Sequence, residues 1–298
     1  MKIFDCFMYF DEDLVLELRL NYLSKFVDHF VIVESKFNHK GEERELKFDL
    51  RNFKEFESKI TYISLDKNPQ GIDKINKSDS ELEKSHKYIL NSAKRENFQR
   101  NQILIGLNNA AADDWIIVSD VDEIPNLNNV NFKELKNKLL FFKQDMMYYK
   151  FNLKYDNFIW VGSKACKKKN LVSPQWLRNI KDKNYPWWRL DTYFSELKFR
   201  DIKFIEEGGW HFSYIKTPNL IEKKLRSYLH HHEYDLRPIG IEGIKKMIEN
   251  KEAIYNLKHD QRSLNKIGNG EKLTKINLSN LPEYITLNKK KFDEWLDN

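Results

Sequence analysis

The sequence predicts an α/β protein whose first half forms a mostly parallel β-sheet. Short apolar runs rich in strand-forming residues alternate with helix-length segments over residues 1–120, which is typical of βαβ units. One of these runs, "FVIVES" at residues 30–35, is almost continuously apolar until its polar end. This pattern is expected for a strand that is buried on both faces of a parallel sheet.

The elements of the first half follow one another regularly. Leu14 and Leu18 recur at helical spacing, and Asp13 can cap the start of that helix. The predicted elements are strands at residues 2–10, 30–35 and 59–65, a helix at 14–26, a polar loop at 66–80, a long helix at 81–112 with a break near Asn91, and a strand at Trp115–Asp120.

The pattern becomes less regular after residue 132. We expect strands at residues 146–155 and 202–215, helices at 218–230 and 241–257, a polar connection at 259–277 and a last helical segment at 289–297. No internal repeat or long linker separates these parts. The chain is therefore expected to form one domain over residues 1–298, with halves at 1–130 and 131–257 and a C-terminal extension at 258–298.

Charge and cysteine content exclude several classes of protein. The 51 basic and 45 acidic residues give a net charge of +6 and are mixed along the chain, so we expect no nucleic-acid partner. Two cysteines define neither a disulfide framework nor a zinc site. The first residues lack a signal-peptide core, and no apolar run approaches the ~20 residues of a membrane span. We therefore expect a soluble, cytoplasmic protein.

The segment "DDWIIVSDVDEIP" at residues 113–125 carries a dense group of carboxylates. Asp120, Asp122 and Glu123 directly follow an apolar strand, and open α/β sheets bind ligands at the carboxyl ends of strands. Two carboxylates spaced two residues apart can hold a hard divalent cation and leave room for phosphate oxygens. The alternative is a solvated acidic turn, and position alone leaves the two interpretations balanced.

A D-x-D motif after a strand also begins the active site of haloacid-dehalogenase-type phosphatases, whose first aspartate forms a phosphoaspartate. That class expects the motif near the start of its domain, with threonine or valine two residues after the second aspartate. Here Ile124 stands at that position, and three predicted strands come first. The nucleotide-binding interpretation is therefore favoured over the phosphatase.

Several stretches, taken together with this group, are more specific than any single motif. They are "DCFMYFDEDLVLELRLNYL" at 5–23, "VDHFVIVESKF" at 27–37, "LKF" at 46–48, "RENFQRNQILIGL" at 95–107, "SDVDEIP" at 119–125 and "GGWHFSYIKTP" at 208–218, with a weaker match in the closing "PEYITLNKKKFDEWLDN". This set resembles glycosyltransferase family 17, which includes the β-1,4-N-acetylglucosaminyltransferase III-like enzymes. The resemblance covers nearly the whole chain.

The resemblance implies a GT-A-type fold, with a Rossmann-like nucleotide-sugar half and an acceptor half. It also implies UDP-GlcNAc as the donor, a glycan hydroxyl as the acceptor, inversion to a β linkage, and a divalent cation (Mn²⁺ or Mg²⁺) on the D-x-D motif. Eukaryotic members carry a Golgi membrane anchor, which is not expected here. Two rivals stay open: a GT-A enzyme that uses another UDP-sugar, and a non-catalytic glycan-binding protein with a tryptophan-rich surface.

By the same resemblance, Asp120, Asp122 and His211 are the expected cation ligands. Asp122 is expected to make the direct contact that serves catalysis, since the second aspartate usually does so in GT-A enzymes. His211 stands in "GGWHFSY", and its alternative role is a core histidine bonded to a backbone carbonyl. The consecutive histidines at 230–232 point in different directions on a helix and are not expected to share an ion.

Further polar and aromatic residues are assigned to the donor. Arginine suits the paired oxygens of a diphosphate, and Trp210 offers a flat apolar face for a sugar ring. The expected donor-binding residues are Glu34, Arg95, Arg100, Asn101, Asp120, Glu123 and Trp210. The competing interpretations are surface salt bridges for the two arginines, a loop cap for Glu34 and support of the loop for Glu123.

The acceptor side is assigned from the second half of the chain. A carboxylate or a histidine is needed to take the proton from the acceptor hydroxyl, and Glu207, which precedes "GGWHFSY", is the first choice. Glu206 and Asp191 are the alternatives. Trp187 and Trp188, with the nearby Tyr185, are a candidate sugar platform, although aromatic clusters are more often core.

Overall fold

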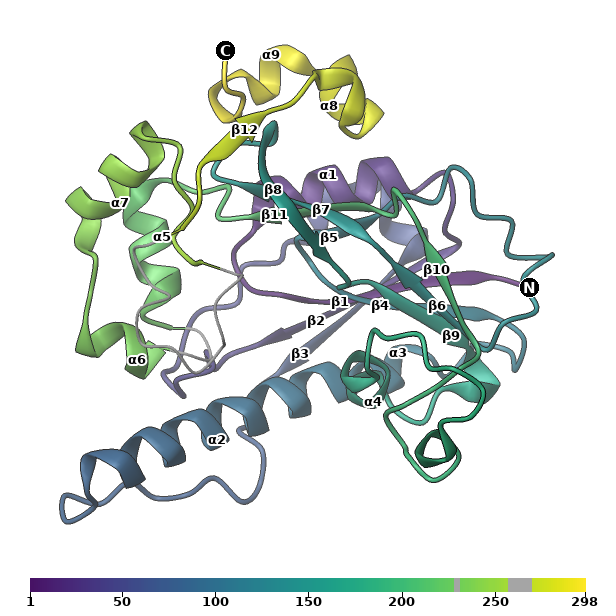
Figure 1. The fold of residues 1–298 in the computed structure, drawn as a ribbon, viewed down its shortest axis with the longest axis horizontal. Coiled ribbons are helices and arrows are strands. Elements are labelled where there is room, and N and C mark those ends of the chain that lie inside the picture. The colour runs from purple at the N-terminus through teal and green to yellow at the C-terminus, as the bar shows by residue number, and fades with distance from the viewer. Residues whose placement is uncertain (228–230, 257–269) are drawn as a thin grey trace.

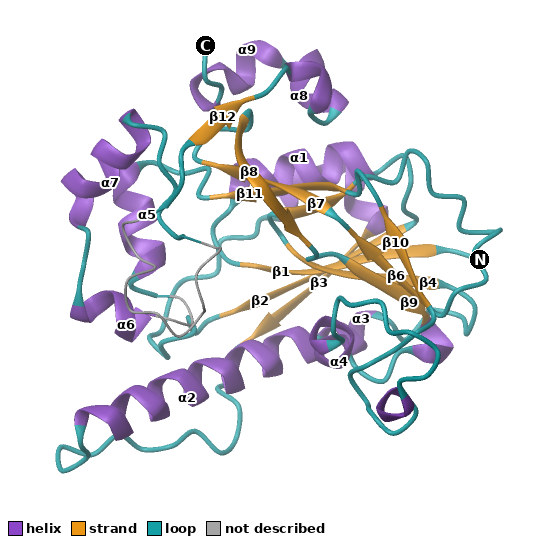
Figure 2. Cartoon of the chain, viewed as in Figure 1, coloured by secondary structure: helices purple, strands orange, loops and turns teal. Residues whose placement is uncertain are grey.

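The computed structural model describes residues 1–227, 231–256 and 270–298. Within these ranges, the strands form one sheet of seven and one sheet of five (Figures 1 and 2). The larger sheet has the order β10-β6-β9-β4-β1-β2-β3. Its strands are β1 (Ile3–Tyr9), β2 (His29–Ser35), β3 (Ile60–Leu65), β4 (Trp115–Asp120), β6 (Leu139–Phe142), β9 (Lys164–Lys167) and β10 (Ile202–Ile205).

The first half of the chain builds the parallel part of this sheet, as predicted. β3, β2, β1 and β4 are parallel neighbours, and their alternate residues enter two cores, with Phe7 in one and Cys6 in the other. α1 (Asp13–Leu23) covers one face, whereas α2 (Glu81–Asn101) and α3 (Ile103–Gly106) cover the other (Figure 1). Because these connections cross opposite faces, the carboxyl ends of β1 and β4 form a switch point where α/β proteins bind ligands.

The second half makes the sheets mixed. β9 is antiparallel to both β4 and β6, and β10 is parallel to β6. The smaller sheet has the order β12-β8-β7-β11-β5 and consists of β5 (Glu123–Pro125), β7 (Gln144–Tyr148), β8 (Leu153–Trp160), β11 (Gly209–Ser213) and β12 (Leu273–Lys275). In the antiparallel pairing of β5 with β11, Glu123 lies opposite His211. This pairing brings the end of the acidic segment beside the strand of the predicted histidine.

Two segments that the sequence predicts as single strands each form two strands in the structure. The run at 146–155 divides into β7 and β8, and Tyr149, in the turn between them, has a φ of 62°. The run at 202–215 divides into β10 and β11, which belong to different sheets. Its turn contains Glu207 with φ 49° and Gly209 with φ 123°. Strand-forming residues flank both turns closely, so the pattern predicts one strand in each case.

The long helix predicted at 81–112 is shorter and breaks at a different place. α2 starts with a capping box on Ser80, and the break between α2 and α3 falls at Gln102. Asn91, the predicted break, lies buried inside α2. Its side-chain amide exchanges two hydrogen bonds with the backbone of Asp73, both of 2.8 Å, so it fastens the preceding polar loop to the helix.

The remaining helices are short. They are α4 (Pro174–Asn179), α5 (Pro218–Leu225), α6 (His231–Leu236), α7 (Gly240–Glu249), α8 (Glu283–Leu287) and α9 (Lys289–Phe292), with 3-10 segments at Leu50–Lys59, Lys168–Asn170, Leu190–Thr192, Leu278–Asn280 and Asp293–Trp295. The helices predicted at 218–230 and 241–257 therefore end earlier, and parts of them, like most of the connection at 259–277, lie outside the described residues. No helix in the described part of the chain has the length and apolar character needed to cross a membrane.

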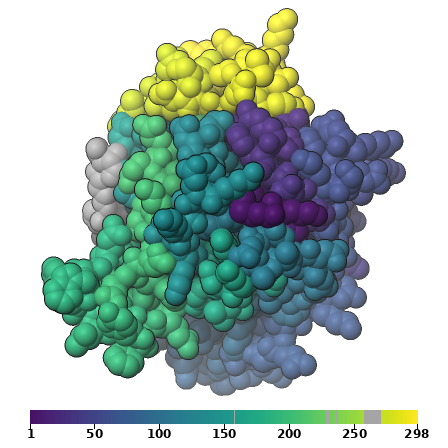
Figure 3. Space-filling view, turned by 90° about the vertical axis from the view of Figure 1, so that its right-hand side faces the viewer, coloured from purple at the N-terminus to yellow at the C-terminus, as the bar shows by residue number. Residues whose placement is uncertain are grey.

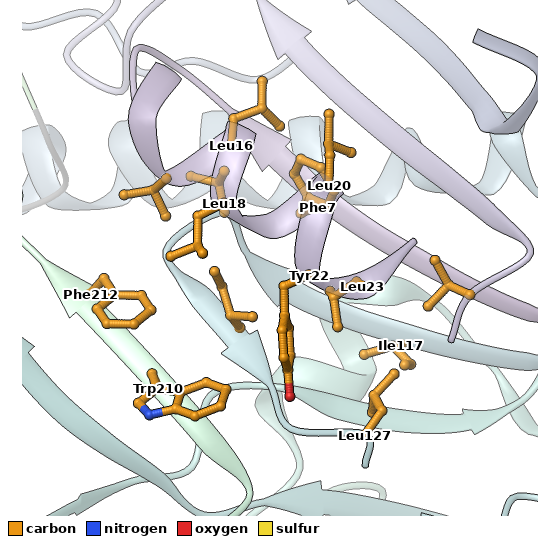
Figure 4. Packing of buried hydrophobic residues seen from close by; sticks show 14 of the residues in the cluster. Phe7, Leu16, Leu18, Leu20, Tyr22, Leu23, Ile117, Leu127, Trp210 and Phe212 are labelled. Atoms are coloured by element: carbon orange, nitrogen blue, oxygen red, sulfur yellow. The ribbon is translucent and has the colours of Figure 1, made fainter. Parts of the chain in front are cut away.

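One core joins both sheets to the C-terminal segment. Its buried members include Phe7 of β1, Leu16, Leu20 and Tyr22 of α1, Trp210 and Phe212 of β11, and Ile285, Phe292 and Leu296 near the C-terminus. Figure 4 shows the side chains of α1 and β11 facing each other in this core. The side chains of α1 thus pack in the same core as β1 and as β11, the strand that carries His211.

Candidate active site

A cavity of about 410 Å³ opens at the carboxyl ends of β1, β2 and β4. Its wall combines aromatic rings with charged side chains from both halves of the chain. The lining residues include Tyr9, Phe10, Glu12, Ser35, Phe37, Asn38, His39, Arg44, Glu96, Gln99, Arg100, Asp120, Asp122, Trp160 and Lys224. A pocket with converging polar groups at a switch point is the expected place for a ligand.

Two arginines hold Asp120. Arg100 Nη2 donates to its Oδ1 at 2.9 Å, and Arg178 Nη2 donates to its Oδ2 at 3.0 Å. Burial of the carboxyl opposes ionisation, but the guanidinium groups of Arg178 and Arg100 outweigh it and lower the pKa of Asp120 to about 2. Asp120 is therefore a fixed carboxylate at neutral pH, with both oxygens engaged by cations.

Asp122 faces a different set of groups. His211 Nε2 lies 3.5 Å from its Oδ1, and Lys224 Nζ lies 3.4 Å from its Oδ2. Lys224 is also 3.1 Å from Glu12, so its ammonium bridges two carboxylates. Burial opposes ionisation of Asp122, but Lys224 and His211 bring its pKa well below the usual range. Glu12, Asp122 and Lys224 thus line one side of the cavity. The His211 imidazole contacts Asp122 from behind, because His211 is not among the described residues that line the cavity.

Glu123 lies beneath the cavity and secures the D-x-D turn. It is fully buried and accepts hydrogen bonds from Arg178 Nη1 at 2.6 Å, Arg178 Nη2 at 2.9 Å and Trp160 Nε1 at 2.7 Å. The backbone N–H of Asp120 donates to the same carboxylate at 2.9 Å. Gly162 packs against this group, since a Cβ there would come within 2.2 Å of Glu123 Oε1. These contacts favour the loop-supporting role of Glu123.

The predicted trio of cation ligands is assembled only in part. Within the described ranges, no cluster of three or more His, Cys, Asp or Glu side chains is arranged to hold an ion, because Asp120 is directed to the arginines. Asp122 and His211 do fit a divalent cation: their 3.5 Å separation is close to the ~3 Å between neighbouring ligands ~2.1 Å from one ion. These two side chains would hold the ion, and phosphate oxygens and water would complete its shell.

Three predicted donor-binding residues serve other contacts and are absent from the described residues that line the cavity. Glu34 accepts four hydrogen bonds, including one from Arg44, which does line the cavity. Arg95 reaches the backbone carbonyl of His39. Asn101 accepts from the first turn of α4 and so positions that helix. Because a buried carboxylate needs donors, these contacts favour the loop-capping role of Glu34.

Trp210 and Glu207 line a second cavity, of about 580 Å³, and not the one beside Asp122. The Trp210 ring packs in the core, with its centroid 5.5 Å from that of Tyr22 (Figure 4). Neighbouring residues of a strand point to opposite faces, so His211 faces Asp122 while Trp210 faces away. The predicted sugar-binding face and the predicted base are therefore separated from the predicted cation ligands.

Sequence reasoning missed four site residues: Glu12, Trp160, Arg178 and Lys224. Glu12 carries a usable signal, because it follows the end of β1 as the acidic motif follows β4. Trp160 places its ring 4.9 Å from the ring of His211. Arg178 and Lys224 lie on the short helices α4 and α5, where no local pattern distinguishes them from other basic residues.

The histidine run and the predicted sugar platform lie elsewhere. The rings of His231 and His232 pack against a tyrosine of α2, and His230 lies outside the described residues. Trp187 and Trp188 are exposed in the loop between α4 and β10. Neither of these two tryptophans is among the described residues that line the cavity beside Asp122.

An α/β fold with charged groups around a switch-point cavity suits an enzyme that acts on a polar, nucleotide-like ligand. Comparison with known families makes the class specific: the protein is a glycosyltransferase. The family model for glycosyltransferase family 17 matches residues 1–297, and the chain belongs to this family.

The chain was also compared with solved structures and with curated proteins. Two solved structures of HddC from Yersinia pseudotuberculosis, one of them complexed with GMP-PN, are similar to this chain at 13% and 11% identity. They cover 72% and 69% of this chain and 91% and 90% of their own, with TM-scores of 0.29 and 0.26. No curated protein matches the chain.

Proposed function

We propose that this family member is a metal-dependent, inverting transferase of the GT-A type. It moves GlcNAc from UDP-GlcNAc to a glycan hydroxyl and forms a β linkage. The observation that carries the proposal is the Asp122–His211 pair beside the cavity at the ends of β1 and β4. The parallel order β3-β2-β1-β4 supports nucleotide binding at that edge.

The leaving diphosphate gains negative charge as the glycosidic bond breaks. A divalent cation (Mn²⁺ or Mg²⁺) held by Asp122 and His211 would supply Lewis-acid stabilisation of that charge. Lys224 adds a fixed positive charge within 3.4 Å of Asp122. Burial opposes the charged form of Lys224, but Glu12 and Asp122 outweigh it and raise its pKa, so this side chain stays protonated.

The donor needs a rigid surface to hold its sugar and ribose. Arg100 and Arg178 fix the Asp120 carboxylate at the cavity edge, where it can accept hydrogen bonds from hydroxyl groups. Trp160 lines the same cavity and presents an aromatic ring, which suits the apolar face of a sugar. Its indole N–H is bonded to Glu123, which holds the ring in place.

The acceptor hydroxyl must lose its proton to a base, and the carboxylates of this cavity are candidates for that role. Glu12 and Glu96 both line the cavity. Burial opposes their ionisation, but Lys224 and Lys216 beside Glu12, and Arg100 beside Glu96, lower the pKa of each carboxyl. Glu12 shares Lys224 with Asp122 and is thus nearer to the proposed cation. We therefore assign Glu12, in place of Glu207, as the first candidate for the general base.

The test measures UDP binding by calorimetry and UDP release from a panel of UDP-sugars, with Mn²⁺ and with EDTA. We expect Mn²⁺-dependent UDP binding and the fastest release from UDP-GlcNAc. Asp122→Asn should abolish the Mn²⁺-dependent part of UDP binding. Asp113→Asn is the matched control, because Asp113 belongs to the same acidic segment but is exposed and paired with Lys169.

Each other outcome selects a different function. Turnover of another UDP-sugar without turnover of UDP-GlcNAc would replace the donor and keep the class of reaction. Sugar binding that survives EDTA, with no affinity for UDP, would instead identify a glycan-binding protein. Unchanged Mn²⁺-dependent binding in Asp122→Asn would move the cation site away from Asp122.

A further inference from the structure

The loop between α4 and β10 exposes an unusual concentration of large apolar side chains. Trp187, Trp188, Leu190, Tyr193 and Phe194 are between 62% and 90% exposed. We call these five residues the aromatic loop. The part of the chain that contains them, green in Figure 3, protrudes at the lower left of the molecule. Soluble proteins keep such patches small unless they serve an interaction.

Cationic side chains surround the aromatic loop and hold its shape. The Arg200 guanidinium lies 4.0 Å above the Tyr193 ring and donates to the Trp187 carbonyl at 2.7 Å. Arg189 and Lys198 both bind Asp191, so the acidic group inside the loop is neutralised. Lys181 and Lys183 are exposed just before it. Asp182, between these lysines, and Glu196, after Phe194, are exposed as well. The tip is therefore apolar, and its border carries charges of both signs in which basic residues outnumber acidic ones.

This combination matches the chemistry of an anionic membrane surface. Tryptophan and tyrosine prefer the headgroup region because their rings are apolar and their N–H and O–H groups are polar. Basic residues beside them are attracted to anionic lipids, and the whole chain has a net charge of +6. A neutral glycan would use the rings but would not use the exposed Lys181 and Lys183. A protruding tip also inserts into a bilayer without needing a complementary groove.

We propose that the aromatic loop binds the protein to bilayers that contain anionic phospholipids. The rings of Trp187, Trp188 and Phe194 enter the headgroup region, and the surrounding lysines and arginines contact phosphate groups. The loop continues directly from α4, which carries Arg178 of the candidate active site. Attachment through this loop would therefore fix the orientation of the cavity relative to the bilayer.

The experiment is co-sedimentation of the full chain with vesicles of phosphatidylcholine alone and of equal parts phosphatidylcholine and phosphatidylglycerol. We expect binding to the anionic vesicles that weakens with salt. The triple variant Trp187→Ser, Trp188→Ser and Phe194→Ser should bind these vesicles at least about tenfold more weakly than the wild type. The triple variant Leu82→Ser, Ile105→Ser and Leu287→Ser removes exposed apolar residues elsewhere and should bind like the wild type.

A second measurement uses the intrinsic tryptophan fluorescence of the protein and needs no added label. Tryptophan fluorescence should shift to shorter wavelength when anionic vesicles are added, and this shift should vanish in the variant that lacks Trp187 and Trp188. Absence of binding by the wild type, or equal binding by both triple variants, would overturn the proposal. A vesicle-free, concentration-dependent self-association that the aromatic-loop variant loses would also overturn it, in favour of a second copy of the chain as the partner.

Discussion

Replacing Arg178 by methionine tests whether the D-x-D turn depends on one buried cation. Arg178 donates two hydrogen bonds to Glu123, of 2.6 and 2.9 Å, and one of 3.0 Å to Asp120. The Arg178 side chain is 12% exposed and that of Glu123 is 0% exposed. Methionine fills much of the same space without charge, so the variant leaves Glu123 as a buried carboxylate that has lost its cation.

The expected loss in the free energy of unfolding depends on the hydrogen-bond donors that remain around Glu123 and Asp120. Removing one partner of a buried ion pair costs about 3–5 kcal/mol. Glu123 keeps the indole N–H of Trp160 and the backbone N–H of Asp120, and Asp120 keeps Arg100. These remaining donors place the expected loss in the free energy of unfolding at the lower end of the range, about 3 kcal/mol.

Urea denaturation at pH 7, followed by tryptophan fluorescence, measures this loss. Arg51→Met is the control, because it removes an exposed ion pair with Asp49 and should leave the midpoint unchanged. The double variant Arg178→Met with Glu123→Gln should be more stable than Arg178→Met alone, since it leaves no unpaired buried charge. A loss below about 1 kcal/mol, or a double variant no more stable than the single one, would refute the reasoning.

Three further predictions follow from the charges of the site and from Lys164, whose ammonium donates to the backbone carbonyls of Arg178 and Ile180. Asp120 has a folded pKa of about 2, below its ordinary 3.8, so its contribution to stability is lost as the pH falls through this window. The free energy of unfolding of Asp120→Asn should therefore fall less steeply than that of the wild type between pH 4 and 2. Parallel curves of unfolding free energy against pH would contradict this. Burial, reinforced by Arg178, lowers the pKa of Lys164 from 10.5 to about 8. Between pH 8 and 10.5 the unfolded chain therefore binds more protons than the folded protein. The free energy of unfolding of the wild type, relative to that of Lys164→Met, should rise over this pH range. A difference between the two proteins that stays constant with pH would contradict this prediction. Lys224→Met removes the ammonium that bridges Glu12 and Asp122, so Mn²⁺ should bind about tenfold more tightly, equivalent to about 1.4 kcal/mol; titration of free Mn²⁺ by electron paramagnetic resonance checks this, and weaker binding would show that Lys224 supports the site.

The parallel half of the fold could be predicted because its signals are local. β1, β2, β3 and β4 lie within a residue or two of the predicted strands, since β1, β2 and β4 bury runs of adjacent apolar side chains and β3 is rich in strand-forming residues. The same locality places Asp120 and Asp122 at the carboxyl end of a buried strand. The turn after β7 carries no such local signal, because Tyr149 is not a typical turn residue. The turn after β10 does contain the glycine pair Gly208 and Gly209, but the apolar residues on both sides favour one continuous strand.

The sequence by itself determined the positions of the first four strands along the chain, the family and the position of the acidic motif. Only the tertiary structure decided which side chains meet that motif. Arg178 and Lys224 reach Asp120 and Asp122 from helices far along the chain, and the pleat of β11 directs His211 towards them. The physical reason is that local apolar patterns fix individual elements, whereas the partner of a buried charge depends on how distant elements pack and in which register their strands pair.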